Sequence, residues 1–155
     1  MRFSDPLGLK VDLSLSNTEV NRALERIKRT KRGRELYQMM DRDPRICRII
    51  STKGAGFAGR PRGTCDVVID PDWHPEVATT AGRKSASTER ILAHEMGHAA
   101  TNLGDTGPGR MDNVIVNETP VVLELGLAAR THYDVPSWWL LVYPAPRGVE
   151  VPRAP

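Results

Sequence analysis

The 155-residue sequence lacks the features that define several special classes of protein. It has only two cysteines, Cys47 and Cys65, too few for a disulfide framework and without the paired spacing of a structural zinc site. No stretch approaches the roughly 20 apolar residues that cross a bilayer, and the N-terminus lacks the apolar core of a secretory signal peptide. We therefore expect no membrane span, and any export must use another route.

The two cysteines lie in apolar, strand-like runs. Free Cys is often buried, so the favoured interpretation is a pair of buried free thiols. A single cross-strand disulfide, which would suit an exported protein, is the alternative.

The charge balance is mildly basic, with a net charge of +3 at pH 7 and a pI near 9.1. Basic residues concentrate in segment 26–34. No interleaved aromatics or known binding motif accompany them, so we interpret the segment as a solvated helix face and expect no nucleic-acid partner. A composition of 39% hydrophobic and 26% charged residues is ordinary for a globular protein, and the length suits one domain.

Hydrophobic periodicity and turn residues predict helices and short strands. The first predicted element is a helix over 18–40, capped by Asn17 or Thr18, which Gly33 could break in two. Two strands follow, over 45–51 and 64–70. Two more helices are predicted, one from Ser87 or Thr88 to Gly104 and one from about 119 to 131. Segment 71–87 is predicted to be irregular, and the proline-rich tail to be extended, with residues 138–143 closing the core.

The central helix carries His94-Glu95-Met96-Gly97-His98, a His-Glu-x-x-His pattern. Residues four apart share one helix face, so both imidazoles can bind one Zn²⁺ while Glu95 projects beside the open coordination position. Zinc lowers the pKa of a bound water to about 7, and Glu95 would take the proton as general base while the water attacks a peptide carbonyl. The pattern predicts a zinc metallopeptidase. We expect an α+β fold: a mainly helical single domain with a small sheet packed near this helix.

Gly97 is an unfavourable residue inside a helix, costing about 1 kcal/mol relative to Ala. We therefore expect a neighbouring group to pack closely against Gly97. The other face of the helix is predicted to face the core, through Leu92, Met96, Ala99 and Leu103.

A catalytic zinc needs a third protein ligand. We choose Glu118, twenty residues after His98 at the start of a predicted helix, from which a short loop could fold it back over the metal helix. Asp105 and Asp112 remain the main alternatives. Tyr133 is a candidate donor of a hydrogen bond to the oxyanion.

Two further candidates for the third ligand, Glu124 and His132, rank below these three. A site with three histidines would require Gly at position 101 and His at 104. The chain has Thr101 and Gly104, which excludes that class.

The runs Ile91–Ala99, 113–118 and 125–133 resemble bacterial secreted-effector zinc metallopeptidases, which include the NleD-like injected proteases and the metallopeptidase tails of type VI secretion spike proteins. The resemblance covers roughly residues 66–133, and the His-Glu-x-x-His element is its sharply diagnostic part. It implies a protease that is delivered into a target cell by a specialised secretion system and cleaves a protein there.

The N-terminal run Asp5-Pro6-Leu7-Gly8-Leu9 is similar to the junction that closes the core of Rhs-repeat polymorphic toxins before their C-terminal toxin. This resemblance implies that residues 1–9 are a junction, cut after Leu9, and that residues 10–155 are the metallopeptidase toxin. It also implies an Rhs-type carrier shell and a cognate immunity protein. We expect the toxin itself to be a monomer.

Two other functions remain open. The chain could be a non-catalytic binding module that grips a target protein or nucleic acid through segment 26–34. Alternatively, the zinc could hydrolyse a non-peptide bond, for example in a cell-wall or nucleotide substrate. Replacing Glu95 and testing a broad protein panel would separate these functions.

Overall fold

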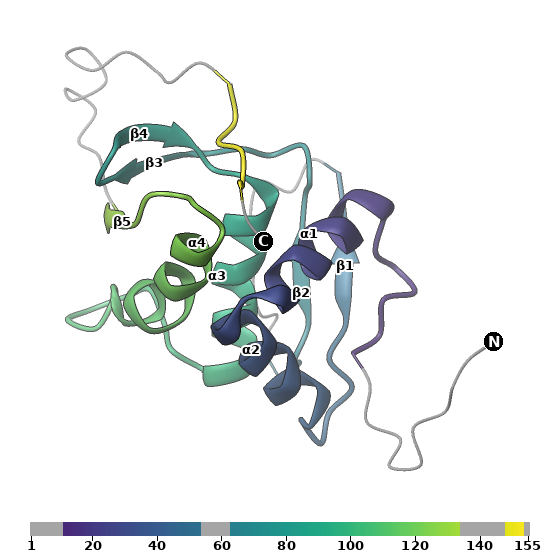
Figure 1. Ribbon diagram of the computed structural model, residues 1–155. Coiled ribbons are helices and arrows are strands. Elements are labelled where there is room, and N and C mark those ends of the chain that lie inside the picture. Colours follow the sequence, from purple (N-terminus) through teal and green to yellow (C-terminus); the bar gives the residue numbers. More distant parts are fainter. Residues whose placement is uncertain (1–10, 54–62, 134–147, 154–155) are drawn as a thin grey trace.

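The computed structural model describes residues 11–53, 63–133 and 148–153. They form a single α+β domain in which helices dominate and small sheets lie beside the central helix, as the sequence predicted (Figure 1). The expected junction 1–9 and the tail segment 138–143 lie outside the described residues. Within the described part, no helix is long and apolar enough to cross a membrane.

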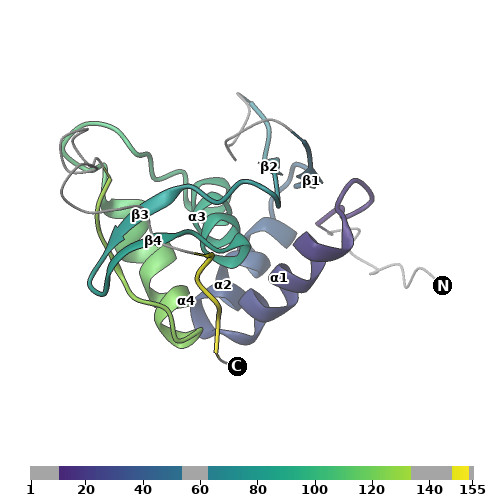
Figure 2. The same cartoon turned by 90° about the horizontal axis from the view of Figure 1, so that it is seen from above.

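The central element is helix α3 (Thr88–Thr101), which carries the His-Glu-x-x-His pattern. It packs against three other helices, namely α1 (Thr18–Arg29), α2 (Lys31–Asp41) and α4 (Thr119–Glu124), and against strand β2 (Val67–Ile69). Figure 2, seen from above, shows α3 between the α1–α2 pair and the hairpin of strands β3 (Glu76–Thr79) and β4 (Gly82–Ser85). Most of the buried apolar residues join one core, including Leu24, Ile27, Leu36, Ile69, Leu92, Met96 and Leu125. Leu92, Met96 and Ala99 are buried as predicted, whereas Leu103 is only partly buried.

Helices α1 and α2 replace the single long helix predicted over 18–40. Asn17 caps α1 as predicted, accepting a hydrogen bond from the Val20 amide. The break lies at Thr30, whose hydroxyl accepts from the Gly33 amide and so caps α2. Gly33 serves close packing instead, because a Cβ there would lie 2.1 Å from the Ile27 carbonyl oxygen.

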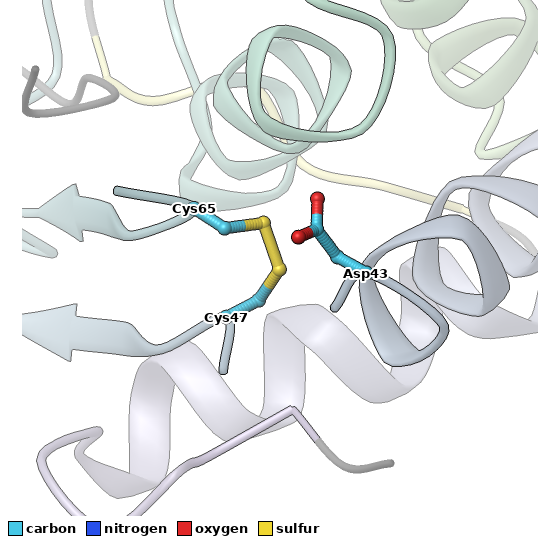
Figure 3. A group of neighbouring side chains, drawn as sticks. All are labelled: Asp43, Cys47 and Cys65. Atoms are coloured by element: carbon cyan, nitrogen blue, oxygen red, sulfur yellow. A yellow bond between two sulfur atoms is a disulfide. The ribbon is translucent and has the colours of Figure 1, made fainter. Parts of the chain in front are cut away.

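Strands β1 (Ile49–Ser51) and β2 are parallel and shorter than the runs that predicted them. Just before each strand lie Cys47 and Cys65, which the structure joins as a disulfide with a Cα–Cα distance of 4.5 Å (Figure 3). The interpretation as two free thiols was therefore wrong, because the parallel pairing brings the two backbones within disulfide range. The Asp43 carboxylate lies beside this pair (Figure 3), but the bonded sulfurs offer no thiolate to a metal.

Strands β3 (Glu76–Thr79) and β4 (Gly82–Ser85) form an antiparallel hairpin where an irregular segment was predicted. Residues 80 and 81 form the turn, and Gly82, with φ of +87°, leads out of it as the first residue of β4. Strand β5 (Arg130–His132) pairs with the other edge of β3. The helix predicted to reach residue 131 was too long, because α4 stops at Glu124 and Gly126, with φ of +74°, then redirects the chain.

Helix α3 begins as predicted, with the Ser87 hydroxyl accepting from the Arg90 amide. Its C-terminal cap is Asn102, two residues before the predicted Gly104 cap, because Asn102 adopts the left-handed conformation with φ of 59°. Asn tolerates this conformation better than other non-glycine residues. After the following loop, a π-helical turn, η1 (Val114–Glu118), packs against α3 and continues directly into α4.

Candidate metal centre

Two histidines of α3 point their Nε2 atoms at one place, where these atoms lie 3.0 Å apart. Each ring is fixed by its other nitrogen. Nδ1 of His94 donates to the Glu118 carboxylate at 2.9 Å, and Nδ1 of His98 donates to the Leu103 carbonyl oxygen at 2.5 Å. An imidazole that donates from Nδ1 presents the lone pair of Nε2. Both lone pairs are therefore directed to one shared point.

A carboxylate from the loop after α3 meets the same point. The Oδ2 atom of Asp105 lies 2.7 Å from Nε2 of His98 and 3.2 Å from Nε2 of His94. Ligand atoms around a tetrahedral zinc lie about 3.3 Å apart, and the spacings here, 2.7 to 3.2 Å, are somewhat shorter. The left-handed turn at Asn102 reverses the chain and so brings Asp105 back over the helix. Two imidazole nitrogens and one carboxylate oxygen are a donor set that zinc accepts.

Tyr133 directly follows β5, and its hydroxyl also reaches this point. It donates a hydrogen bond to the second oxygen of Asp105 and lies 3.0 Å from Nε2 of His94. The Arg130 guanidinium stacks over the Tyr133 ring at 4.6 Å from its centroid. The structure thus brings the predicted Tyr133 to His94 and Asp105.

Glu118 lies on the opposite side of the His94 ring. One carboxylate oxygen accepts from Nδ1 of His94, and the other accepts from Nη1 of Arg90 at 2.8 Å. The π-helical turn η1, packed on α3, buries Glu118 to 1% exposure. Glu118 therefore meets His94 at Nδ1, away from the two Nε2 atoms, whereas the carboxylate that meets both Nε2 atoms is that of Asp105.

The remaining candidates for the third ligand lie elsewhere. Glu124 accepts from the Lys31 amide at the start of α2. Asp112 is exposed on the loop before η1. The side chain of His132 contacts the Thr131 hydroxyl on strand β5.

Charges around the histidines keep the carboxylates ionised. Burial raises the pKa of Asp105, but hydrogen bonds from His94, His98 and Tyr133 outweigh it and lower that pKa. Burial likewise raises the pKa of Glu118. The hydrogen bond and the charge of His94, together with the charges of Arg130 and Arg90, outweigh burial and lower that pKa. Burial lowers the pKa of His94, and hydrogen bonds to both carboxylates raise it to about 9. Protons therefore compete with a cation for His94.

Glu95 lines a cavity of about 320 Å³ together with His94, Asp105 and Tyr133. It is 8% exposed, and among the described residues its Oε2 atom has no hydrogen-bond partner. Burial raises its pKa to about 7, against the opposing charges of His94 and His98, and a nearby divalent cation would favour the ionised form. Five apolar residues, Trp73, Pro75, Val77, Ala86 and Ile91, form one part of the cavity wall, and the charged Arg90, Glu118 and Arg130 complete it.

Comparison with known proteins supports this architecture. No family model and no curated protein matches the sequence. Among solved structures, a similar one is the crystal structure of the Salmonella zinc metalloprotease effector GtgA, with a TM-score of 0.56 and 18% identity over 76% of this chain and 67% of that chain. The two chains share a fold. At this identity the likeness establishes the fold alone.

Two asparagines of η1 and its N-cap explain the glycine inside α3. A Cβ on Gly97 would lie 2.2 Å from Oδ1 of Asn113 and 2.7 Å from Cβ of Asn117. Asn113 also donates to the His94 carbonyl oxygen at 2.9 Å and accepts from Asn117 at 2.8 Å. The expectation of a close neighbour at Gly97 is confirmed, although sequence reasoning did not single out the asparagines that provide it.

Gly97→Ala should therefore destabilise the protein despite the better helix propensity of alanine. We expect a loss of about 1–3 kcal/mol in the free energy of unfolding, typical of overpacking, measured by urea denaturation. Gly104→Ala is the control, because nothing lies within 4 Å of its added Cβ. Equal stability of both variants would contradict the close approach of η1 to α3.

Proposed function

We propose that this chain is a zinc-dependent endopeptidase that acts as an effector or toxin inside another cell. The observation that carries the proposal is the convergence of Nε2 of His94, Nε2 of His98 and the carboxylate of Asp105 near Glu95, whose buried Oε2 atom has no hydrogen-bond partner in the described part of the chain. Its resemblance in fold to a zinc metalloprotease effector supports the same reading.

In this proposal His94, His98 and Asp105 hold Zn²⁺, and Asp105 takes the role first expected of Glu118. Zinc held there would supply Lewis acidity, which activates water and polarises a peptide carbonyl. Glu95 accepts the proton of the attacking water and then delivers it to the leaving amine. The Tyr133 hydroxyl lies close enough to donate to the oxyanion, as expected from the sequence.

The cavity also suggests which substrates fit. Its apolar residues, which include Trp73 and Ile91, line the same cavity as Glu95 and would accommodate an apolar side chain near the cleaved bond. The substrate class we propose is therefore a protein segment with an apolar residue at that place.

The delivery proposal rests on the sequence. The similarity of residues 5–9 to an Rhs junction supports an Rhs-type carrier, cleavage after Leu9 and a cognate immunity protein. GtgA is itself an effector, which agrees with delivery into a target cell.

The structure weakens the binding-module alternative. Within the basic segment 26–34, Lys28 pairs with Glu25, Arg26 pairs with Glu89, and Arg32 binds an asparagine and a glutamate. Three of the six basic side chains of the segment are thus engaged within the chain and are less available to a partner.

The test is metal-dependent cleavage by the purified full chain on a broad panel of proteins. We expect cleavage fragments, loss of cleavage after zinc removal with a chelator, and recovery on adding Zn²⁺. Cell-wall and nucleotide substrates are assayed in parallel. Hydrolysis of one of these with no cleavage of any protein would overturn the peptidase proposal.

A further inference from the structure

A buried network of charges connects the C-terminal segment 148–153 to the metal helix. At its centre Arg90 of α3 is 1% exposed. Its Nε donates to Glu150 at 2.5 Å, its Nη2 to the other oxygen of Glu150 at 2.9 Å, and its Nη1 to Glu118 at 2.8 Å. Nη2 also donates to the Ala128 carbonyl oxygen at 2.6 Å. The guanidinium is thus held on three sides.

Glu150 is itself held by the backbone around it. Val149 forms a parallel bridge with Ser85 at the end of β4, and the Glu150 amide donates to the Ser85 carbonyl oxygen at 3.0 Å. The Arg153 amide donates to the Leu125 carbonyl oxygen at 2.9 Å. Figure 1 shows this segment, in yellow, passing the first turn of α3. The carboxylate of Glu150 therefore has a fixed place beside Arg90.

The other end of the network is the histidine. With one oxygen of Glu118 bound to Arg90, its second oxygen is directed at Nδ1 of His94. A carboxylate in this position fixes the tautomer and ring orientation of a metal-binding imidazole. Four residues thus form one continuous chain of hydrogen bonds from the C-terminal segment to the metal centre.

We propose that Glu150 is a positioning residue of the metal centre, acting through Arg90 and Glu118 on the orientation of His94. The C-terminal segment 148–153 is then a working part of the site as well as of the fold. This inference rests on the proposed zinc function.

A different role of Glu150 must be separated from this one. It also accepts from the amide and hydroxyl of Ser87, both at 3.1 Å, at the N-terminus of α3. Through that contact Glu150 would stabilise the helix without affecting His94. The experiment therefore compares single and double variants.

The experiment measures zinc affinity by chelator competition and the Co²⁺ absorption spectrum, which reports ligand geometry, for the full chain and three variants. We expect Glu118→Gln to weaken zinc binding by about 10- to 100-fold and Glu150→Gln by about 10-fold, each with an altered Co²⁺ spectrum. The double variant should bind no more weakly than Glu118→Gln alone, because both changes act on one path.

Asp66→Asn is the matched control. Its side chain is 5% exposed, as is that of Glu150, and it binds Arg48 through both oxygens at 3.0 and 2.6 Å. It should lower thermal stability and leave zinc affinity and the Co²⁺ spectrum unchanged. Unchanged zinc binding in Glu150→Gln, or an undiminished effect of it in the Glu118→Gln background, would overturn the inference alone. No zinc binding by the unaltered chain would overturn the proposed function as well.

Discussion

Glu95→Gln should lower the rate of protein cleavage by about 10²- to 10⁴-fold while zinc stays bound. Glu95 lines the cavity beside Nε2 of His94, and its Oε2 atom has no hydrogen-bond partner among the described residues. An amide of the same shape cannot accept the proton of an attacking water. The measurement is kcat/KM on the best protein substrate of the panel, with zinc content by elemental mass spectrometry.

The matched control for this change is Glu89→Gln, a carboxylate in the first turn of the same helix. Glu89 lies five residues before His94 and pairs with Arg26 of α1 at 3.6 Å. It should keep both activity and zinc. Full activity of Glu95→Gln would contradict the general-base role, and full toxicity of an inactive Glu95→Gln protein would favour the binding-module alternative.

The histidine pair could be predicted because its geometry is local. Four residues of helix place His94 and His98 on one face whatever the rest of the chain does. The third ligand depends on tertiary structure, and spacing alone led to Glu118. The loop after Asn102 and the π-helical turn η1 decide which carboxylate reaches which nitrogen of His94. Asp105, kept as an alternative, is the carboxylate that meets both Nε2 atoms.

The fold shows the same division between local and distant causes. The caps at Asn17 and Ser87 depend on adjacent residues and were predicted correctly. The β3–β4 hairpin was missed because its strands are short and β4, with Arg83 and Lys84, is polar and half-buried. Gly82, with its positive φ, was the available signal for the turn.

Nothing in the local sequence around its members indicates the buried network of charges. Arg90 and Glu150 are 60 residues apart, and neither stands in a motif. Buried charges need partners, because an unpaired charge in the interior is costly. Only the fold shows that these partners lead from the C-terminal segment to the metal centre.

Asp105→Ala should weaken zinc binding by more than about 100-fold, beyond the roughly 10- to 100-fold loss that follows removal of a partner behind a ligand. The reason is that Oδ2 of Asp105 lies 2.7 and 3.2 Å from the two Nε2 atoms, whereas Glu118 contacts His94 through Nδ1. Zinc affinity by chelator competition is measured beside Glu118→Gln. Asp105→Ala should also remove the hydrogen bond that holds the Tyr133 hydroxyl near His94.

Asp112→Ala is the control for this comparison, since Asp112 is exposed on the same loop and was itself a candidate ligand. It should bind zinc as the unaltered chain does. Zinc that is retained in Asp105→Ala but lost in Glu118→Gln would contradict the assignment and return the ligand role to Glu118. A larger loss of zinc affinity from Asp105→Ala than from Glu118→Gln would mean that Asp105 is the third ligand. Glu118 would then act on the zinc only through the imidazole of His94.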